Sequence, residues 1–147
     1  MPPTTAIFLD DGGVMNDNGL RGAQWQRLVA EYLAPRLGGT LQDWAEANRA
    51  VVAGEGEFRD RFWRRPGADY GTYREELGKA WLLGMTELVG VSAPEGEKCV
   101  AMARDTNAFV TRRVHSAYPG AVDAIRQLHS GGYRLFTASG EDSEDLE

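Results

Sequence analysis

The sequence predicts an α/β protein, in which a core built on a parallel sheet carries a separate, inserted α-helical subdomain. Two short apolar segments, residues 4–10 and 133–138, have the length and the turn-bounded ends of buried strands. The residues between them repeat apolar side chains at helical spacing, and a block of about a hundred residues is too long for a connecting loop. We therefore expect two neighbouring parallel strands with a small helical bundle inserted between them.

The first strand ends in an acidic, glycine-rich turn. Four apolar residues, 6–9, are followed by Asp10 and Asp11 and then by a glycine pair that lets the backbone turn sharply. An acidic residue at the carboxyl end of a parallel strand lies where open α/β sheets bind ligands. The same pattern is also how an ordinary strand enters a turn, and the polar residues 16–18 either line a site or serve that turn.

The helical block is predicted to contain four amphipathic helices. The first is closed by Gly38-Gly39, and Thr40 with Asp43 forms a capping-box pattern at the start of the second. The expected helices cover residues 21–37, Thr40 to a break at Gly54 and Gly56, 70–89, and Pro94 to about Val114.

Aromatic and basic residues alternate between the second and third of these helices. Phe58, Phe62 and Trp63 stand among four arginines before Pro66-Gly67 closes the segment. Such a cluster either meets an anionic substrate or is a short helix that packs its rings inward and leaves its arginines in solvent, which is the more common arrangement.

A second core segment begins at Tyr118-Pro119-Gly120. A short amphipathic helix follows, Gly131-Gly132 stops it, and the second strand runs from residue 133 to Ser139-Gly140. Helix, glycine and strand in this order suit a crossover unit of a parallel sheet. Asp10 and Ser139 would then share one edge of the sheet, with Thr137 in place of Ser139 if the strand ends earlier.

Composition limits the classes of partner. The net charge of −6 argues against nucleic-acid binding, and the sequence holds no apolar stretch long enough to span a membrane. A single cysteine, Cys99, excludes an internal disulfide and reads as a small buried helix residue. With no signal peptide visible at the first residues, we expect a cytoplasmic protein.

The first turn resembles the opening signature of the haloacid dehalogenase-like (HAD) hydrolases, an apolar strand followed by Asp-x-Asp-Gly-Val/Thr. Asp10 matches the nucleophile, Gly13 the glycine and Val14 the residue after it, whereas Gly12 stands where the family has its second Asp. A shift of one position would place Asp11 on that second Asp but would put Leu9 at the nucleophile position, so the match on Asp10 is retained.

The resemblance implies an organisation for most of the chain. It predicts a Rossmann-like core from residues 1–19 and 116–147, with residues 20–115 as the helical cap. Ser139, with the backbone at Gly140, matches the family's second signature, which holds the group that is transferred.

The family's downstream signatures, a Lys and then one or two acidic residues, have no match here. The two lysines lie inside the helical block, and the chain stops eight residues after Ser139. We expect a fragment of a longer protein with an incomplete sheet. Its exposed strand edges should either favour self-association into a homo-oligomer or leave the isolated chain marginal in stability.

The resemblance implies hydrolysis of a small-molecule substrate, phosphorylated or halogenated, through an Asp10 nucleophile. In a phosphatase, Mg²⁺ would bind the Asp10 carboxylate and the Gly12 carbonyl. Gly12 offers no carboxyl to protonate a leaving alkoxide, although Asp11 is a candidate substitute acid; halide leaves without a proton, and the dehalogenating branch needs no metal. The alternatives are a catalytically inactive HAD-like domain that acts as a binding or assembly module, and a structural fragment.

Overall fold

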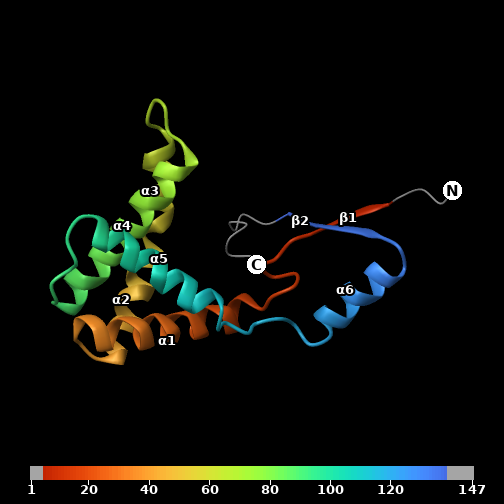
Figure 1. Ribbon diagram of the computed structural model, residues 1–147, viewed down its shortest axis with the longest axis horizontal. Helices are drawn as coiled ribbons and strands as arrows, with labels where there is room; N and C mark the ends of the chain where they lie inside the picture. The colour runs from red at the N-terminus through yellow and green to blue at the C-terminus, as the bar shows by residue number, and fades with distance from the viewer. Residues whose placement is uncertain (1–4, 139–147) are drawn as a thin grey trace. The chain divides into compact units, whose positions relative to one another are not determined.

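The computed structural model describes residues 5–138 of the 147-residue chain. Within them lie six helices and two strands (Figure 1). The strands are β1 (Ala6–Leu9) and β2 (Arg134–Thr137); the helices are α1 (Asn18–Leu37), α2 (Leu41–Ala53), α3 (Glu55–Trp63), α4 (Tyr70–Val89), α5 (Glu97–Thr111) and α6 (Ala121–Ser130).

The two strands form one parallel pair, which confirms their predicted pairing. Leu9 lies opposite Thr137, and the Ala138 amide extends the ladder by donating to the Leu9 carbonyl at 2.8 Å. Phe8 and Phe136 stack on one face with ring centroids 5.2 Å apart, and Phe8 remains 66% exposed. The carboxyl ends of both strands therefore lie side by side, as the sequence predicts.

The predicted Rossmann-like α/β fold is wrong. Helices dominate residues 5–138, and the sheet within that range consists of two strands of four residues each. The physical reason is that only two segments carry a strand pattern; the further strands of a doubly wound sheet came from the family resemblance and not from residues of this chain. The described fold is mainly helical, with a single parallel strand pair joined to α6.

The chain separates into two compact units. One contains residues 1–24 and 114–147, and the other contains residues 25–113. The sequence placed the corresponding limits at 20 and 115. Helix α1 begins in the first unit and continues into the second.

The 25–113 unit has a closely packed core. Helix α4 packs against both α2 and α5, and the described hydrophobic residues that are buried all lie in this unit. Trp44 is fully buried and its indole nitrogen donates to the Gly38 carbonyl at 2.7 Å, while Trp81 donates to the Asn48 amide oxygen at 2.8 Å. Each fully buried large side chain contributes about 1.5–3 kcal/mol.

Helix ends follow the expected signals in most places. The Thr40–Asp43 capping box is present, α4 has the predicted bounds, and Gly90 closes it in the left-handed conformation. Gly54 separates α2 from α3, as predicted, but Gly56 lies inside α3. The fourth predicted helix is shorter than expected, because α5 starts after Pro94 and ends at Thr111.

Local features of the helical unit agree with their sequence patterns. Cys99 is buried in α5, and burial raises the pKa of its thiol. The basic–aromatic segment is a helix, α3, with Phe62 buried and most arginines exposed.

No helix within residues 5–138 combines the length and apolar character that crossing a membrane requires.

Candidate functional site

Asp10 lies immediately after β1 and is exposed to solvent. One of its carboxylate oxygens accepts a hydrogen bond from the Asp11 amide at 2.8 Å. The chain then turns through Gly12 and Gly13, and Gly13 has a φ of 79°. This positive φ favours glycine, because a side chain there would be strained. The turn thus leaves the Asp10 side chain open at the end of the strand.

Asp11, in contrast, is buried, with 6% of its surface exposed. Its carboxylate pairs with the Arg21 guanidinium at 2.5 Å and also accepts a hydrogen bond from the Asn16 side chain. Its backbone carbonyl accepts from the amides of Met15 and Asn16, both at 3.0 Å. The side chain and the backbone carbonyl of Asp11 therefore both stabilise the turn. In each side-chain contact the carboxylate is the hydrogen-bond acceptor.

The segment before α6 supports the same turn. The Asn16 side-chain oxygen accepts from the Ser116 hydroxyl at 3.0 Å, and Ser116 is itself buried. The Asp17 amide donates to the Ser116 carbonyl at 2.7 Å, and the Tyr118 amide donates to the Met15 carbonyl at 3.0 Å. Residues far apart in the sequence thereby fix the loop that follows Asp10.

Helix α1 is anchored to this turn at its first residues. The Asp17 carboxylate accepts from the amides of Gly19 and Leu20 at 2.8 and 3.1 Å, which is the work of a helix-capping side chain. Gln24 exchanges two hydrogen bonds with the backbone of His115, at 2.7 and 2.9 Å. Of the polar residues 16–18, Asn16 and Asp17 therefore serve the turn and the helix.

Of the predicted substrate-binding residues, the structure describes only Thr137. Ser139 and Gly140 lie outside the described residues. Thr137, the substitute for Ser139, ends β2 directly opposite Leu9 and is exposed. Asp10 thus follows a strand end that adjoins the end carrying Thr137.

The Asp10 carboxylate and the Gly12 carbonyl are the donors predicted for magnesium. The Gly12 carbonyl accepts no backbone hydrogen bond within residues 5–138, and Asp10 is exposed, so both oxygens suit a hard cation. No group of three or more His, Cys, Asp or Glu side chains in that range is arranged to hold a metal. Mg²⁺ would therefore depend on water and substrate oxygens for the rest of its coordination.

Sequence reasoning missed the residues that hold Asp11. Arg21 is ten positions away, and its pairing with Asp11 depends on where α1 starts, which was predicted three residues too late. Asn16 and Ser116 are a hundred positions apart, so no local pattern links them. Asp17 carried a usable signal, since Asp directly before a helix is a preferred capping residue.

Comparison of the sequence with protein-family models and with curated proteins gives no match.

Proposed function

We propose that this protein is a hydrolase of the HAD-like type, in which Asp10 attacks a small halogenated or phosphorylated substrate. The observation that carries the proposal is the state of the Asp10 carboxylate: exposed at the end of a parallel strand, with one oxygen held by a backbone amide at 2.8 Å. No hydrogen bond within residues 5–138 engages the other oxygen. A positioned carboxylate with one accessible oxygen is what nucleophilic catalysis requires.

The reaction runs in two steps. An Asp10 oxygen attacks the carbon that bears the halogen, the carbon–halogen bond breaks, and halide leaves with the bonding electrons. Water then attacks the carbonyl carbon of the resulting ester, releasing the hydroxylated product and one proton and restoring the carboxylate. With a phosphorylated substrate, the attack is on phosphorus, and water cleaves the aspartyl-phosphate.

The environment of Asp11 favours leaving groups that need no proton. Its carboxylate is buried, ion-paired with Arg21 and hydrogen-bonded by Asn16, and these contacts use it as an acceptor. Gly12 offers no carboxyl at the position where the family has its acid. General acid catalysis is typically worth about 10²–10⁴-fold, so alkyl phosphates would turn over poorly. Halide and p-nitrophenolate leave without that help.

Magnesium belongs only to the phosphate reaction. When bound, it would offset charge on the phosphate oxygens. The Asp10 carboxylate and the Gly12 carbonyl are the donors that this chain offers near the turn.

The test is turnover of 2-haloacids without metal and of p-nitrophenyl phosphate with Mg²⁺, by the wild type and by Asp10→Asn. The amide keeps the shape of the carboxylate and removes the nucleophile, so turnover should disappear while the helical circular dichroism stays unchanged. Asp123→Asn is the matched control, because it makes the same change on the exposed face of α6 in the same unit.

Full activity in the Asp10→Asn protein contradicts the proposed nucleophile. Absence of turnover by the wild type on a broad substrate panel contradicts the hydrolase and favours a non-catalytic binding module. Loss of turnover in Asp123→Asn as well would mean that the assay reports folding and not the role of Asp10.

A further inference from the structure

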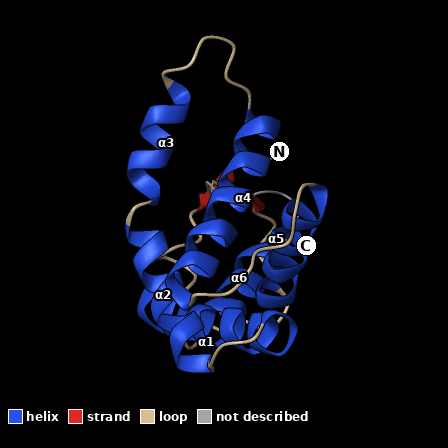
Figure 2. Cartoon of the chain, turned by 90° about the vertical axis from the view of Figure 1, so that its left-hand side faces the viewer, coloured by secondary structure: helices blue, strands red, loops and turns tan. Residues whose placement is uncertain are grey.

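An exposed group of aromatic rings and arginines lies where α3 meets the start of α4. The end of α3, the start of α4 and the loop between them project beyond the other helices of the 25–113 unit, as two views at right angles show (Figures 1 and 2). We call this surface the arginine–aromatic patch and define it by Phe58, Arg61, Trp63, Arg64 and Tyr70.

The rings of the patch are fixed by a buried pair beneath them. Phe62 and Tyr73 are buried with ring centroids 5.3 Å apart, and burial raises the pKa of the Tyr73 hydroxyl. Trp63 contacts both rings at 5.3–5.4 Å, yet 45% of it remains exposed. Tyr70, at 6.1 Å from Tyr73, is 46% exposed. Large exposed rings held rigid in this way lose little entropy on binding.

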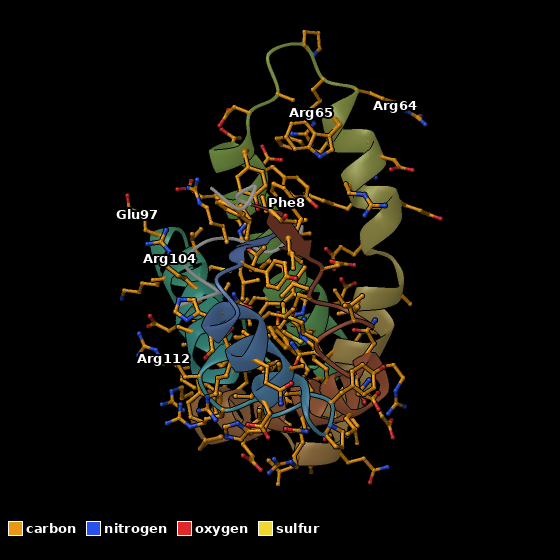
Figure 3. All side chains as sticks on the ribbon, turned by 90° about the vertical axis from the view of Figure 1, so that its right-hand side faces the viewer. Phe8, Arg64, Arg65, Glu97, Arg104 and Arg112 are labelled. Carbon is orange, nitrogen blue, oxygen red and sulfur yellow. The ribbon has the colours of Figure 1, made fainter. Side chains whose placement is uncertain are left out.

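The arginines give the patch a local positive charge. Residues 58–70, which span the patch, contain four arginines and two acids, Asp60 and Asp69. Arg65 is engaged by Glu76 at 2.7 Å, and Arg61 lies 5.9 Å from the centre of the Phe58 ring. Arg64 extends outward from the end of α3 (Figure 3) and forms no ion pair with any residue in the described range. Arg61 thus presents its guanidinium group beside the half-buried Phe58 ring, and Arg64 presents its guanidinium group to solvent.

We propose that the arginine–aromatic patch binds an acidic segment of a partner protein, in which Asp or Glu side chains flank an apolar one. Trp, Tyr and Arg are the residues that dominate interface binding energy, and guanidinium groups pair with carboxylates in bidentate geometry. The apolar side chain of the partner would cover Trp63, and its carboxylates would meet Arg61 and Arg64. This surface does not include Asp10 or its turn.

Charge distribution favours a protein segment over a nucleic acid or an anionic membrane. The 25–113 unit contains 13 acidic and 13 basic residues, and the whole chain has a net charge of −6. Nucleic acids and anionic bilayers carry negative charge over long distances, and a protein that binds them needs an extended basic surface. A short acidic segment needs complementarity only over the few residues of the patch.

The experiment uses the full chain and a fluorescein-labelled peptide of glutamates around a central leucine pair, followed by fluorescence polarisation at low salt. Arg61→Gln combined with Arg64→Gln should weaken binding about tenfold, because each partly exposed ion pair contributes modestly. Trp63→Ser should weaken it by a similar factor through the lost apolar contact. The matched control is Lys98→Gln combined with Arg112→Gln, which removes the same charge from exposed positions outside the patch.

The proposal requires that wild type and control bind alike and that lysine in place of the peptide's glutamates abolishes binding. It is overturned if the acidic peptide does not bind, or if the control variant loses as much affinity as the patch variant. It is also overturned if oligothymidylate or phosphatidylserine vesicles bind in preference to the peptide. Circular dichroism confirms that each variant is folded.

Discussion

The two adjacent aspartates at the end of β1 have opposite surroundings. Asp10 is exposed and held by one backbone amide, whereas Asp11 is buried and held by Arg21 and Asn16. A carboxylate that anchors a turn is not free to act on a substrate, and an exposed one contributes little to folding. The structure therefore divides the pair into an accessible carboxylate and a buried carboxylate that anchors the turn.

The first prediction concerns the Arg21–Asp11 pair. Arg21→Met should lower the free energy of unfolding by about 2–3 kcal/mol, because it leaves the buried Asp11 carboxylate without its charged partner. Arg27→Met is the control, since the Arg27–Glu31 pair at 2.8 Å is exposed and exposed pairs contribute about 0.5 kcal/mol or less. Urea denaturation measures the free energy of unfolding of both variants. Equal effects in the two variants would show that the buried pair does not anchor the turn.

A second prediction concerns the acid sensitivity of α4. Hydrogen bonds from the Thr72 backbone amide and hydroxyl hold the pKa of Asp69 below its ordinary value of 3.8. The stability that this cap contributes is therefore present above pH 3.8 and is lost as the pH falls through the lowered value. Asp69→Asn keeps a capping oxygen that does not titrate, so the melting temperature should fall less steeply in acid.

Asp60→Asn is the control for this measurement, because Asp60 is exposed and caps no helix. Thermal unfolding followed by circular dichroism at a series of acidic pH values gives the two slopes. An Asp69→Asn slope equal to that of the wild type would mean that the cap does not contribute.

At the level of elements, the helices follow from periodicity and end signals in the sequence. The capping box at Thr40 and the glycine that ends α4 are local patterns, and both are present in the structure. The sequence predicts too late a start for α1, because the capping residue Asp17 lies among polar residues that are equally typical of a turn. Pro94 did not start α5, since the helix begins three residues later, after Gly96.

Gly39 provides the third prediction. It has a φ of 80°, and a Cβ there would lie 2.6 Å from a Val89 side-chain carbon and 3.1 Å from the Trp44 indole nitrogen. Gly39→Ala should cost about 1–3 kcal/mol in packing beyond the strain of the positive φ. Gly67→Ala isolates that strain, because Gly67 has a φ of 73° and open space around it. Equal losses of unfolding free energy would contradict the packing argument.

For the whole molecule, the strand patterns of the sequence predict two strands, and the error lies in the larger sheet that the resemblance added. The pairing of residues 6–9 with 134–137 could be predicted, because both are apolar runs with turn-bounded ends. The larger sheet rested on resemblance alone, and residues 5–138 contain no further strand segment to supply it. The long-range contacts around Asp11 were likewise invisible, since pairs such as Asn16–Ser116 carry no local pattern.

The two units should differ in local stability. The described hydrophobic residues that are buried all belong to the 25–113 unit, and α6 contains no buried residue. Regions with few buried apolar contacts open at lower free energy. Hydrogen exchange should therefore be markedly faster for amides of β1, β2 and α6 than for those of α4. Protection of β1 amides equal to that of α4 would contradict this difference.

The most direct test of Asp10 as a nucleophile is a single turnover in water enriched in ¹⁸O, with enzyme in excess over a 2-haloacid. In the proposed mechanism water attacks the carbonyl carbon of the Asp10 ester, so the heavy oxygen should enter the Asp10 side chain, while the product keeps an ordinary oxygen taken from Asp10. Mass spectrometry of the peptide that contains Asp10 detects the label. Heavy oxygen in the product, with none in that peptide, would show that water attacks the substrate directly and would contradict the nucleophilic role.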